Sequence, residues 1–298
     1  MFSTGISKVH APKLTAAISA HQTVTGPPLI DRATHDKRGQ LNVKNTWRFG
    51  EKEFQYIREV LDSGFGSGTS GGMNSRFEQA FAKKVGAPYA ITFNSGTSTL
   101  HAALFAAGVG YGDEVILPAL TVICNLSVTL AQNAIPVFAD IDPDTFNIDP
   151  VDVERKITER TKAIMPVPLY GLPCDYDPLL ELAEKHNLVI INDAAQAFMA
   201  EYKGRPIAEI CPMTSYSLEN SKHITTGDGG IIVATEEEYA VKMRKFGSLG
   251  YKNLQAKEGR IRISKDSFQK PSYKRHDQMG LNYRMPEVAA ALGLAQTE

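Results

Sequence analysis

Apolar residues recur at helical spacing in two stretches after residue 50. The stretch "EKEFQYIREVLDSG" carries its apolar residues on one face and is closed by Gly64, which predicts an amphipathic helix. The stretch "SRFEQAFAKKVG" repeats the pattern, opening with a capping box of Ser75 and Glu78 and ending at Gly86. Two successive helices are therefore expected at the start of the ordered part of the chain.

From Tyr89 onward, short apolar runs alternate with stretches of helical character. The helix-like stretches are "GTSTLHAALFAAG", "NLSVTLAQN" and "PLLELAEKHN". The apolar runs are "YAITF", "EVILP", "IPVFAD", "AIMPV", "LVIIN", "SYSL" and "GIIVA". They are apolar throughout, as expected of parallel strands that are covered on both faces. The pattern predicts an α/β fold with a mostly parallel, doubly wound sheet.

The composition is that of an ordinary globular protein. The 298 residues are 43% hydrophobic and 22% charged, with a net charge of −1, so we expect no general attraction to nucleic acid or to a membrane. No apolar run approaches the roughly 20 residues that span a bilayer. The three cysteines are widely spaced and the chain has no CxxC or HExxH motif. We therefore predict no disulfide, no metal site and a cytoplasmic location.

Two segments are expected to be irregular. Residues 1–45 contain breakers such as "GPPL" and "DKRGQ", which predict an N-terminal arm. The segment "GSGTSG", from Gly66 to Gly71, has the G-x-G-x-x-G spacing of a dinucleotide-binding fingerprint, but it follows a helical pattern and not a strand. We favour a substrate-binding loop or a plain loop over a nucleotide site.

Three polar features stand where predicted strands end. The segment "NSGTST" follows "YAITF" and begins a helix, so it would form a phosphate cradle, or no more than a helix cap. Asp193 ends "LVIIND", at the end of a strand where ligands bind in such sheets, although a simple N-cap is the alternative. Lys222 follows "SYSL" and precedes the glycine turn "TTGDGG", which permits close packing around it.

The three features together fit one cofactor, pyridoxal 5′-phosphate. A lysine amine binds its aldehyde as a Schiff base, and an aspartate pairs with the protonated pyridine nitrogen. A helix N-terminus and hydroxyl groups hold the phosphate. Each feature is weak alone, and their occurrence together in this order favours a pyridoxal-phosphate site.

The chain resembles the DegT/DnrJ/EryC1/StrS aminotransferases, the sugar-aminotransferase branch of fold-type I pyridoxal-phosphate enzymes. The resemblance covers roughly residues 46–298, in the stretches "NSGTSTLHAAL", "VGYGDEVILPALT", "PVFADIDPDTFNIDP", "ITERTKAIMPVPLYGLPCD", "INDAAQAF", "YKGRPI", "SKHITTGDGG" and "GLNYRMPEVAAALGLAQTE". It implies a pyridoxal-phosphate-binding large domain over residues 46–285. Residues 286–298 would begin a small C-terminal domain, on the order of 100 residues, which is largely missing and normally closes part of the substrate pocket.

The resemblance also implies roles for single residues. Lys222 would be the Schiff-base lysine and proton carrier, Asp193 would bind the pyridine nitrogen, and Gln196 would lie near the ring hydroxyl. The other implied cofactor contacts are Gly96, Thr97, Ser98 and Ser217 around the phosphate, Val122 beside the ring, and Asn282, which would reach the neighbouring subunit's site.

Four residues differ from the usual family pattern. Val122 stands where an aromatic residue often stacks on the cofactor ring, so aliphatic packing or another segment must cover the ring. Asn192 replaces the usual Glu before the cofactor aspartate, Pro168 replaces a His in "PVPLYG", and Asp228 replaces a Glu in "TTGDGG".

The implied function is a transaminase. Members of the family are homodimers with shared active sites that move an amino group, usually from glutamate, to a keto-sugar attached to a nucleotide. A sugar dehydratase with the same cofactor is one alternative, but such relatives carry a histidine in place of the lysine, and here Lys222 precedes His223. A truncated, non-catalytic or regulatory member is the other alternative.

Overall fold

The computed structural model describes residues 33–35, 41–43, 48–66, 68, 72–261 and 263–298. The chain divides into two units, residues 1–49 and 50–298. In the first unit, β1 (Ala33–His35) pairs antiparallel with β2 (Leu41–Val43). The rest of the predicted arm, and most of the Gly66–Gly71 segment, lie outside the described residues. The domain boundaries expected from the sequence remain predictions.

The second unit is built on a seven-stranded sheet with the strand order β3-β11-β10-β7-β6-β4-β5. All neighbouring strands are parallel except β11, which runs antiparallel to both β3 and β10. This confirms the predicted α/β class. The strands are β3 (Tyr89–Phe93), β4 (Glu114–Pro118), β5 (Ile135–Ala139), β6 (Thr161–Ile164), β7 (Val189–Asp193), β10 (Met213–Ser217) and β11 (Gly230–Ala234).

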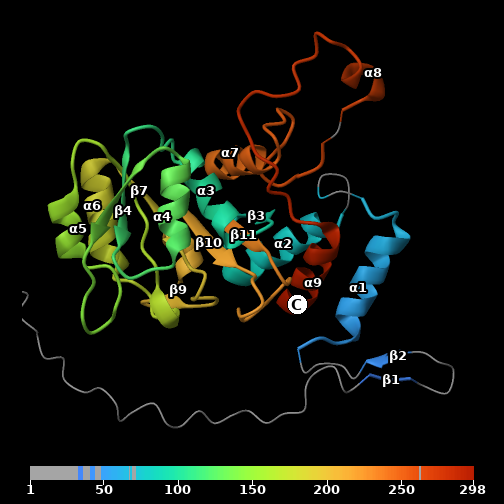
Figure 1. The fold of residues 1–298 in the computed structure, drawn as a ribbon, viewed down its shortest axis with the longest axis horizontal. Helices are drawn as coiled ribbons and strands as arrows, with labels where there is room; N and C mark the ends of the chain where they lie inside the picture. The colour runs from blue at the N-terminus through green and yellow to red at the C-terminus, as the bar shows by residue number, and fades with distance from the viewer. Residues whose placement is uncertain (1–32, 36–40, 44–47, 67, 69–71, 262) are drawn as a thin grey trace, which may run out of the picture. The chain divides into compact units, whose positions relative to one another are not determined.

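Helices cover both faces of this sheet (Figure 1). The helices of this unit are α1 (Glu51–Asp62), α2 (Met73–Val85), α3 (Gly96–Ala106), α4 (Ile123–Ala131), α5 (Pro150–Lys156), α6 (Tyr176–His186), α7 (Glu237–Gly247), α8 (Lys265–Phe268) and α9 (Glu287–Thr297), and α8 lies on a loop away from the sheet. Short 3₁₀ turns span Leu169–Gly171 and Ile207–Glu209, and β8 (Glu201–Tyr202) pairs with β9 (Arg205–Pro206).

Successive residues of the strands feed two separate apolar cores. On β7, for example, Ile190 belongs to the core packed with α2, α6 and α9, whereas Ile191 belongs to the core packed with α3, α4 and α7. Because neighbouring side chains of a strand point to opposite faces, an unbroken apolar run supplies both layers. This is why the predicted strands show no alternation with polar residues.

Helix α2 does not begin as the sequence pattern predicts. The Ser75–Glu78 capping box does not form, because α2 begins two residues before Ser75 with Gly72 as its N-cap. Glu287 of α9 instead accepts the first two backbone amides of α2, at 2.6 and 3.3 Å. A buried carboxylate from the far end of the chain thus caps this helix.

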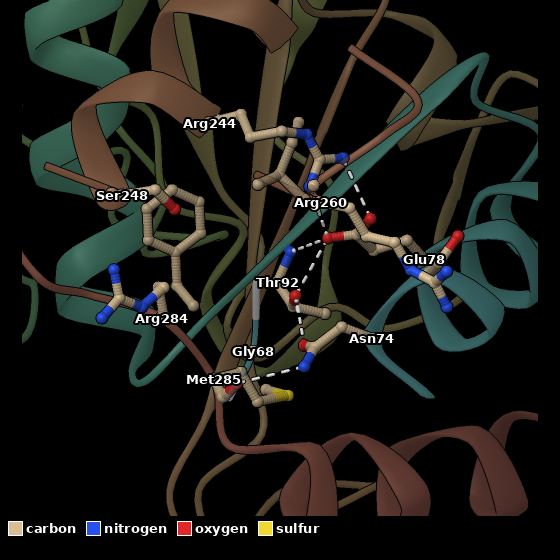
Figure 2. Close-up of a pocket in the computed structure, with 14 residues that line it drawn as sticks. Gly68, Asn74, Glu78, Thr92, Arg244, Ser248, Arg260, Arg284 and Met285 are labelled. Atoms are coloured by element: carbon tan, nitrogen blue, oxygen red, sulfur yellow. Dashed lines mark hydrogen bonds and ion pairs between the residues drawn. The ribbon is translucent and has the colours of Figure 1, made fainter. Parts of the chain in front are cut away.

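Glu78 is used in a buried ion pair. The Nη1 and Nη2 atoms of Arg244 on α7 donate to its two carboxylate oxygens at 3.0 and 2.9 Å, and Thr92 on β3 donates to it at 3.0 Å through its amide and at 2.9 Å through its hydroxyl (Figure 2). The adjoining cavity has a volume of about 30 Å³, enough for a water molecule but not for a substrate. This pair therefore holds α2 and α7 together across the edge strand β3.

Candidate active site

A pocket of about 270 Å³ lies where β3, β7 and β10 end at the same edge of the sheet. It is lined from the first turns of α3 and α4, from the end of β7 and from the loop between β10 and β11. The sequence-predicted residues that line it are Gly96, Thr97, Val122, Asp193, Gln196, Ser217 and Lys222.

The N-terminus of α3 forms one wall of the pocket. A Cβ atom added to Gly96, the first residue of α3, would lie 3.2 Å from the Cβ atom of Ser217. A Cβ atom on Gly230 would lie 2.4 Å from the backbone carbon and oxygen of Ser95. Glycine at both positions allows β10 and β11 to approach the start of α3, where helix N-termini bind anions.

Asp193 is a buried carboxylate in this wall, with 3% of its surface exposed. Its Oδ2 atom accepts a hydrogen bond from Asn125 Nδ2 at 2.9 Å, and its Oδ1 atom accepts the Ala195 amide at 3.2 Å. Burial raises the pKa of the Asp193 carboxyl, while these bonds and the charge of Lys222 act in the opposite direction. A cation at this carboxylate would favour its ionised form.

Lys222 lies half-buried in the loop between β10 and β11. Its backbone amide donates to the Glu219 carbonyl at 3.0 Å. Hydrogen bonds from Ser221 lower the pKa of the Glu219 carboxyl, and the charge of Lys222 adds to this effect. The Lys222 ammonium is therefore within electrostatic reach of both Asp193 and Glu219.

Gln196 and Val122 complete the predicted lining. The Oε1 atom of Gln196 accepts the backbone amide of Tyr170 at 2.9 Å, which fixes the orientation of its carboxamide. Val122 caps the start of α4 and is 51% exposed. It offers an aliphatic surface at the pocket where family members often have an aromatic ring.

Two predicted residues are not among those that line the pocket. The hydroxyl of Ser98 donates to Asn94 Oδ1 at 2.6 Å and lies 2.8 Å from the Ser95 hydroxyl, so it stabilises the start of α3. Asn282 is exposed and pairs with Ser248 in a β-bridge.

The three other residues that depart from the family pattern lie in different parts of the fold. Asp228 lines the pocket. Asn192 is buried, and its Oδ1 atom accepts the Tyr176 hydroxyl at 3.0 Å in the core packed with α2, α6 and α9. Pro168 precedes a 3₁₀ turn. Of these three, Asp228 is the one whose side chain can influence a bound molecule directly.

Sequence reasoning missed several residues at this site, three of which carry polar side-chain groups close to the predicted ones. Asn125 supports Asp193, while Glu219 and Cys124 line the pocket. Burial raises the pKa of the Cys124 thiol to about 11, which keeps it protonated at neutral pH. Their positions in the sequence could have indicated these residues. Both "TVICN" and Glu219 come after predicted strands, at the ligand-binding edge of the sheet.

These residues fit pyridoxal 5′-phosphate. A buried carboxylate that hydrogen bonds from Asn125 and Ala195 help to keep ionised suits a protonated ring nitrogen, and the glycine-lined start of α3 suits a phosphate. Among the described residues that line the pocket, Lys222 is the one cationic side chain. Backbone amides and hydroxyl groups would therefore hold the phosphate, and the Lys222 amine would bind the aldehyde.

Comparison with known proteins establishes the family. The profile of the DegT/DnrJ/EryC1/StrS aminotransferase family matches residues 48–298. The chain belongs to this family. A GDP-perosamine synthase from Caulobacter vibrioides is 41% identical to it over 251 residues, which are 84% of this chain and 63% of that relative. The fold and the sequence motifs are therefore those of this family.

Solved structures of aminotransferases share the fold of this DegT/DnrJ/EryC1/StrS member. An aminotransferase from Psychrobacter cryohalolentis matches with a TM-score of 0.74 and 35% identity, over 85% of this chain and 63% of the other. The pyridoxal-phosphate form of a sugar aminotransferase from Streptococcus pneumoniae, described as putative, matches with a TM-score of 0.72 and 29% identity, over 83% and 64%. The chain thus spans a little under two thirds of the length of these relatives. Within the described residues, no helix combines the length and apolar character needed to cross a membrane.

Proposed function

We propose that this pocket binds pyridoxal 5′-phosphate and transfers an amino group from an amino acid, glutamate, to a keto-sugar attached to a nucleotide. The observation that carries the proposal is the convergence of Lys222, Asp193 and the start of α3 on one pocket. The relative named GDP-perosamine synthase supports a nucleotide-sugar substrate.

Each pocket wall has a role in this proposal. Thr97, Ser217 and the first amides of α3 bind the phosphate, Asp193 holds a proton on the ring nitrogen, and Gln196 binds the ring hydroxyl. Val122 packs against the ring. When bound, the cofactor supplies an electron sink that stabilises negative charge at the amino acid's α-carbon.

Lys222 is the group that moves protons. Its Nζ atom would hold the aldehyde of the cofactor. The same amine would act as the acid and base that moves protons between substrate and cofactor. The charge of Lys222 lowers the pKa of both the Asp193 and the Glu219 carboxyl, which supports a position of the amine near these two groups.

We propose that the active protein is a cytoplasmic homodimer. Asn282 is exposed on this chain and does not line its own pocket, which suits a residue that reaches the site of a second copy. The pocket holds a single cationic side chain among its described residues, so polar groups from a neighbour would add to the phosphate contacts.

The first test is covalent capture of the cofactor. Purified protein is incubated with pyridoxal 5′-phosphate, reduced with borohydride and digested, and mass spectrometry should find the added mass on the peptide that contains Lys222. The variant Lys222→Arg keeps a positive charge but should show neither the mass nor the visible absorption band. Labelling at another lysine would reject Lys222 as the anchor.

The second test is the amino transfer itself. Glutamate alone should convert the bound cofactor to its amine form and release 2-oxoglutarate, and a keto-sugar nucleotide should then restore the starting spectrum. Two separable half-reactions are expected. Conversion that requires both substrates at once would contradict this scheme, and a complete lack of conversion would favour a non-catalytic family member.

A further inference from the structure

The loop that carries Lys222 is bonded to the last helix of the fold. The backbone amide of Thr225 donates to the Oε1 atom of Gln296 at 2.8 Å, across 71 residues of sequence. Thr225 is 1% exposed, so its amide has no access to solvent and depends on a protein acceptor. Gln296 of α9 supplies that acceptor, although its side chain is not part of the pocket lining.

Thr225 is also the residue that closes the loop. Its hydroxyl donates to the Leu218 carbonyl and accepts the Gly227 amide, both at 3.0 Å. The amide of Thr226 donates to the same Leu218 carbonyl at 3.0 Å. These bonds join the two ends of the segment that contains Lys222. A shift of Thr225 would therefore move the whole loop.

Helix α9 is a firm support for this contact. It packs between α1 and α2, as Figure 1 shows in red. A Cβ atom on Gly293 would lie 2.5 Å from the Phe77 ring, so α9 and α2 approach closely. At the other end of α9, Glu287 accepts the first amides of α2. The position of Gln296 is thus fixed by the body of the fold.

The chemistry of the Gln296 side chain indicates that its oxygen is the part in use. Its Nε2 atom is buried and has no hydrogen-bond partner among the described residues. An unpaired buried amide nitrogen destabilises a protein, and an apolar side chain would fill the same space without that penalty. The hydrogen bond that the Gln296 oxygen accepts from the Thr225 amide compensates for this penalty.

We propose that Gln296 is a positioning residue for Lys222: through Thr225 it holds the loop of residues 218–229 so that the lysine faces Asp193. This inference rests on the proposed role of Lys222 as the lysine that binds the cofactor. Without the acceptor, the buried Thr225 amide is unpaired and the loop must open to satisfy it. Lys222 then samples positions away from Asp193 and captures the aldehyde less well.

Three variants separate positioning from helix packing. Gln296→Met keeps the length of the side chain and removes the acceptor, whereas Gln296→Glu keeps an acceptor at the same reach. Thr297→Val is the matched control, because the Thr297 hydroxyl donates to the Gly293 carbonyl at 2.7 Å within α9 itself. Gln296→Ala replaces Gln296→Met if that variant does not fold.

The first measurement is amide hydrogen exchange of residues 219–227 in protein without cofactor. Loss of the acceptor should speed exchange of this segment by about tenfold, as expected for one buried unpaired amide. Gln296→Glu and Thr297→Val should match the parent protein. Equal exchange in Gln296→Met and the parent, or equal acceleration in Thr297→Val, would overturn the proposal.

The second measurement is titration with pyridoxal 5′-phosphate, followed through the visible absorption band and its pH dependence. Gln296→Met should weaken binding about fivefold or more and shift the pH at which the band changes, while Gln296→Glu should restore both. Unchanged binding and an unchanged pH profile in Gln296→Met would refute the positioning role. If the parent protein itself captures no cofactor, the proposed function fails, and the exchange data still decide whether Gln296 holds the loop.

Discussion

Asn125 Nδ2 lies 2.9 Å from Asp193 Oδ2, and this bond joins the first turn of α4 to the end of β7. Asn125 is fully buried, and its Oδ1 atom accepts the Thr121 hydroxyl at 2.9 Å. The amide is therefore oriented with its NH₂ group toward the carboxylate. A donor held in this way favours the ionised form of a carboxylate that burial would otherwise protonate.

Replacement of this donor should weaken cofactor binding. In Asn125→Ala the pKa of Asp193 should rise further, and affinity for pyridoxal 5′-phosphate should fall about tenfold or more, as expected for a lost hydrogen bond to a charged group. Titration of the visible absorption band measures this. Thr129→Val is the control on the same helix, because that hydroxyl donates to the Asn125 carbonyl at 2.8 Å within α4. Equal losses in the two variants would contradict a specific role for Asn125.

Gly96 at the start of α3 and Gly230 at the start of β11 should differ in their tolerance of a side chain. Gly230→Ala puts a Cβ atom 2.4 Å from the Ser95 backbone, whereas Gly96→Ala puts one 3.2 Å from a side-chain atom of Ser217. We expect Gly230→Ala to lower the free energy of unfolding by about 1–3 kcal/mol, a typical effect of overpacking, and Gly96→Ala to lower it less. Urea denaturation measures both, and the reverse order would refute the close approach of β11 to α3.

The buried hydroxyl of Thr214 should be replaceable by a methyl group without loss of stability. Thr214 is fully buried on β10, and its Oγ1 atom has no hydrogen-bond partner among the described residues. Thr214→Val should therefore leave the free energy of unfolding unchanged or raise it by about 1 kcal/mol. Thr99→Val is the contrast, because the Thr99 hydroxyl bonds to the Gly96 carbonyl and to the Ser215 hydroxyl, both at 2.5 Å. A larger loss in Thr214→Val than in Thr99→Val would contradict this assignment.

His101 should make the protein less stable in mild acid. The ring lies 3.0 Å from the Tyr283 hydroxyl and 3.3 Å from Gln132 Oε1, and burial lowers the pKa of His101. The folded state then binds its proton at lower pH than the unfolded state, for which the pKa is about 6.5. Its contribution to stability is therefore present above about pH 6.5 and is lost as the pH falls through the folded pKa.

Denaturation curves at several pH values test this assignment. The difference in stability between the parent and His101→Gln should shrink as the pH falls from about 7 to 5. A difference for His101→Gln that does not vary with pH would refute the pKa direction.

Local sequence patterns predict where the strands lie better than they predict the directions in which the strands run. The apolar runs that become β3, β4 and β7 are visible in sequence because each must fill two cores. The antiparallel direction of β11 is not visible, because an apolar strand has the same pattern in either direction. The helical spacing of α7 was present in Ala240, Met243 and Phe246 and was overlooked, whereas the cap of α2 comes from Glu287, beyond the reach of any local motif.

The residues of the pocket also differ in whether the sequence alone can predict them. Asp193 and Lys222 could be predicted because strand ends in such sheets converge on one edge, so position along the chain is enough to bring them together. Asn125 and Gln296 could not, because their contacts depend on how α4 and α9 pack against the strand ends. Rotation of a helix by one residue would point either side chain elsewhere.

The packing of α9 against α2 also sets an order for biosynthesis. The Glu287 carboxylate that caps α2 is separated from it by 214 residues of sequence. At cellular translation rates, roughly 10–40 s pass between the synthesis of the two segments. During that interval the face of α2 around Phe77 lacks its cover, and chaperones have a defined surface to bind. Folding of residues 50–298 must therefore wait until α9 has been synthesised, even though α1 and α2 leave the ribosome early.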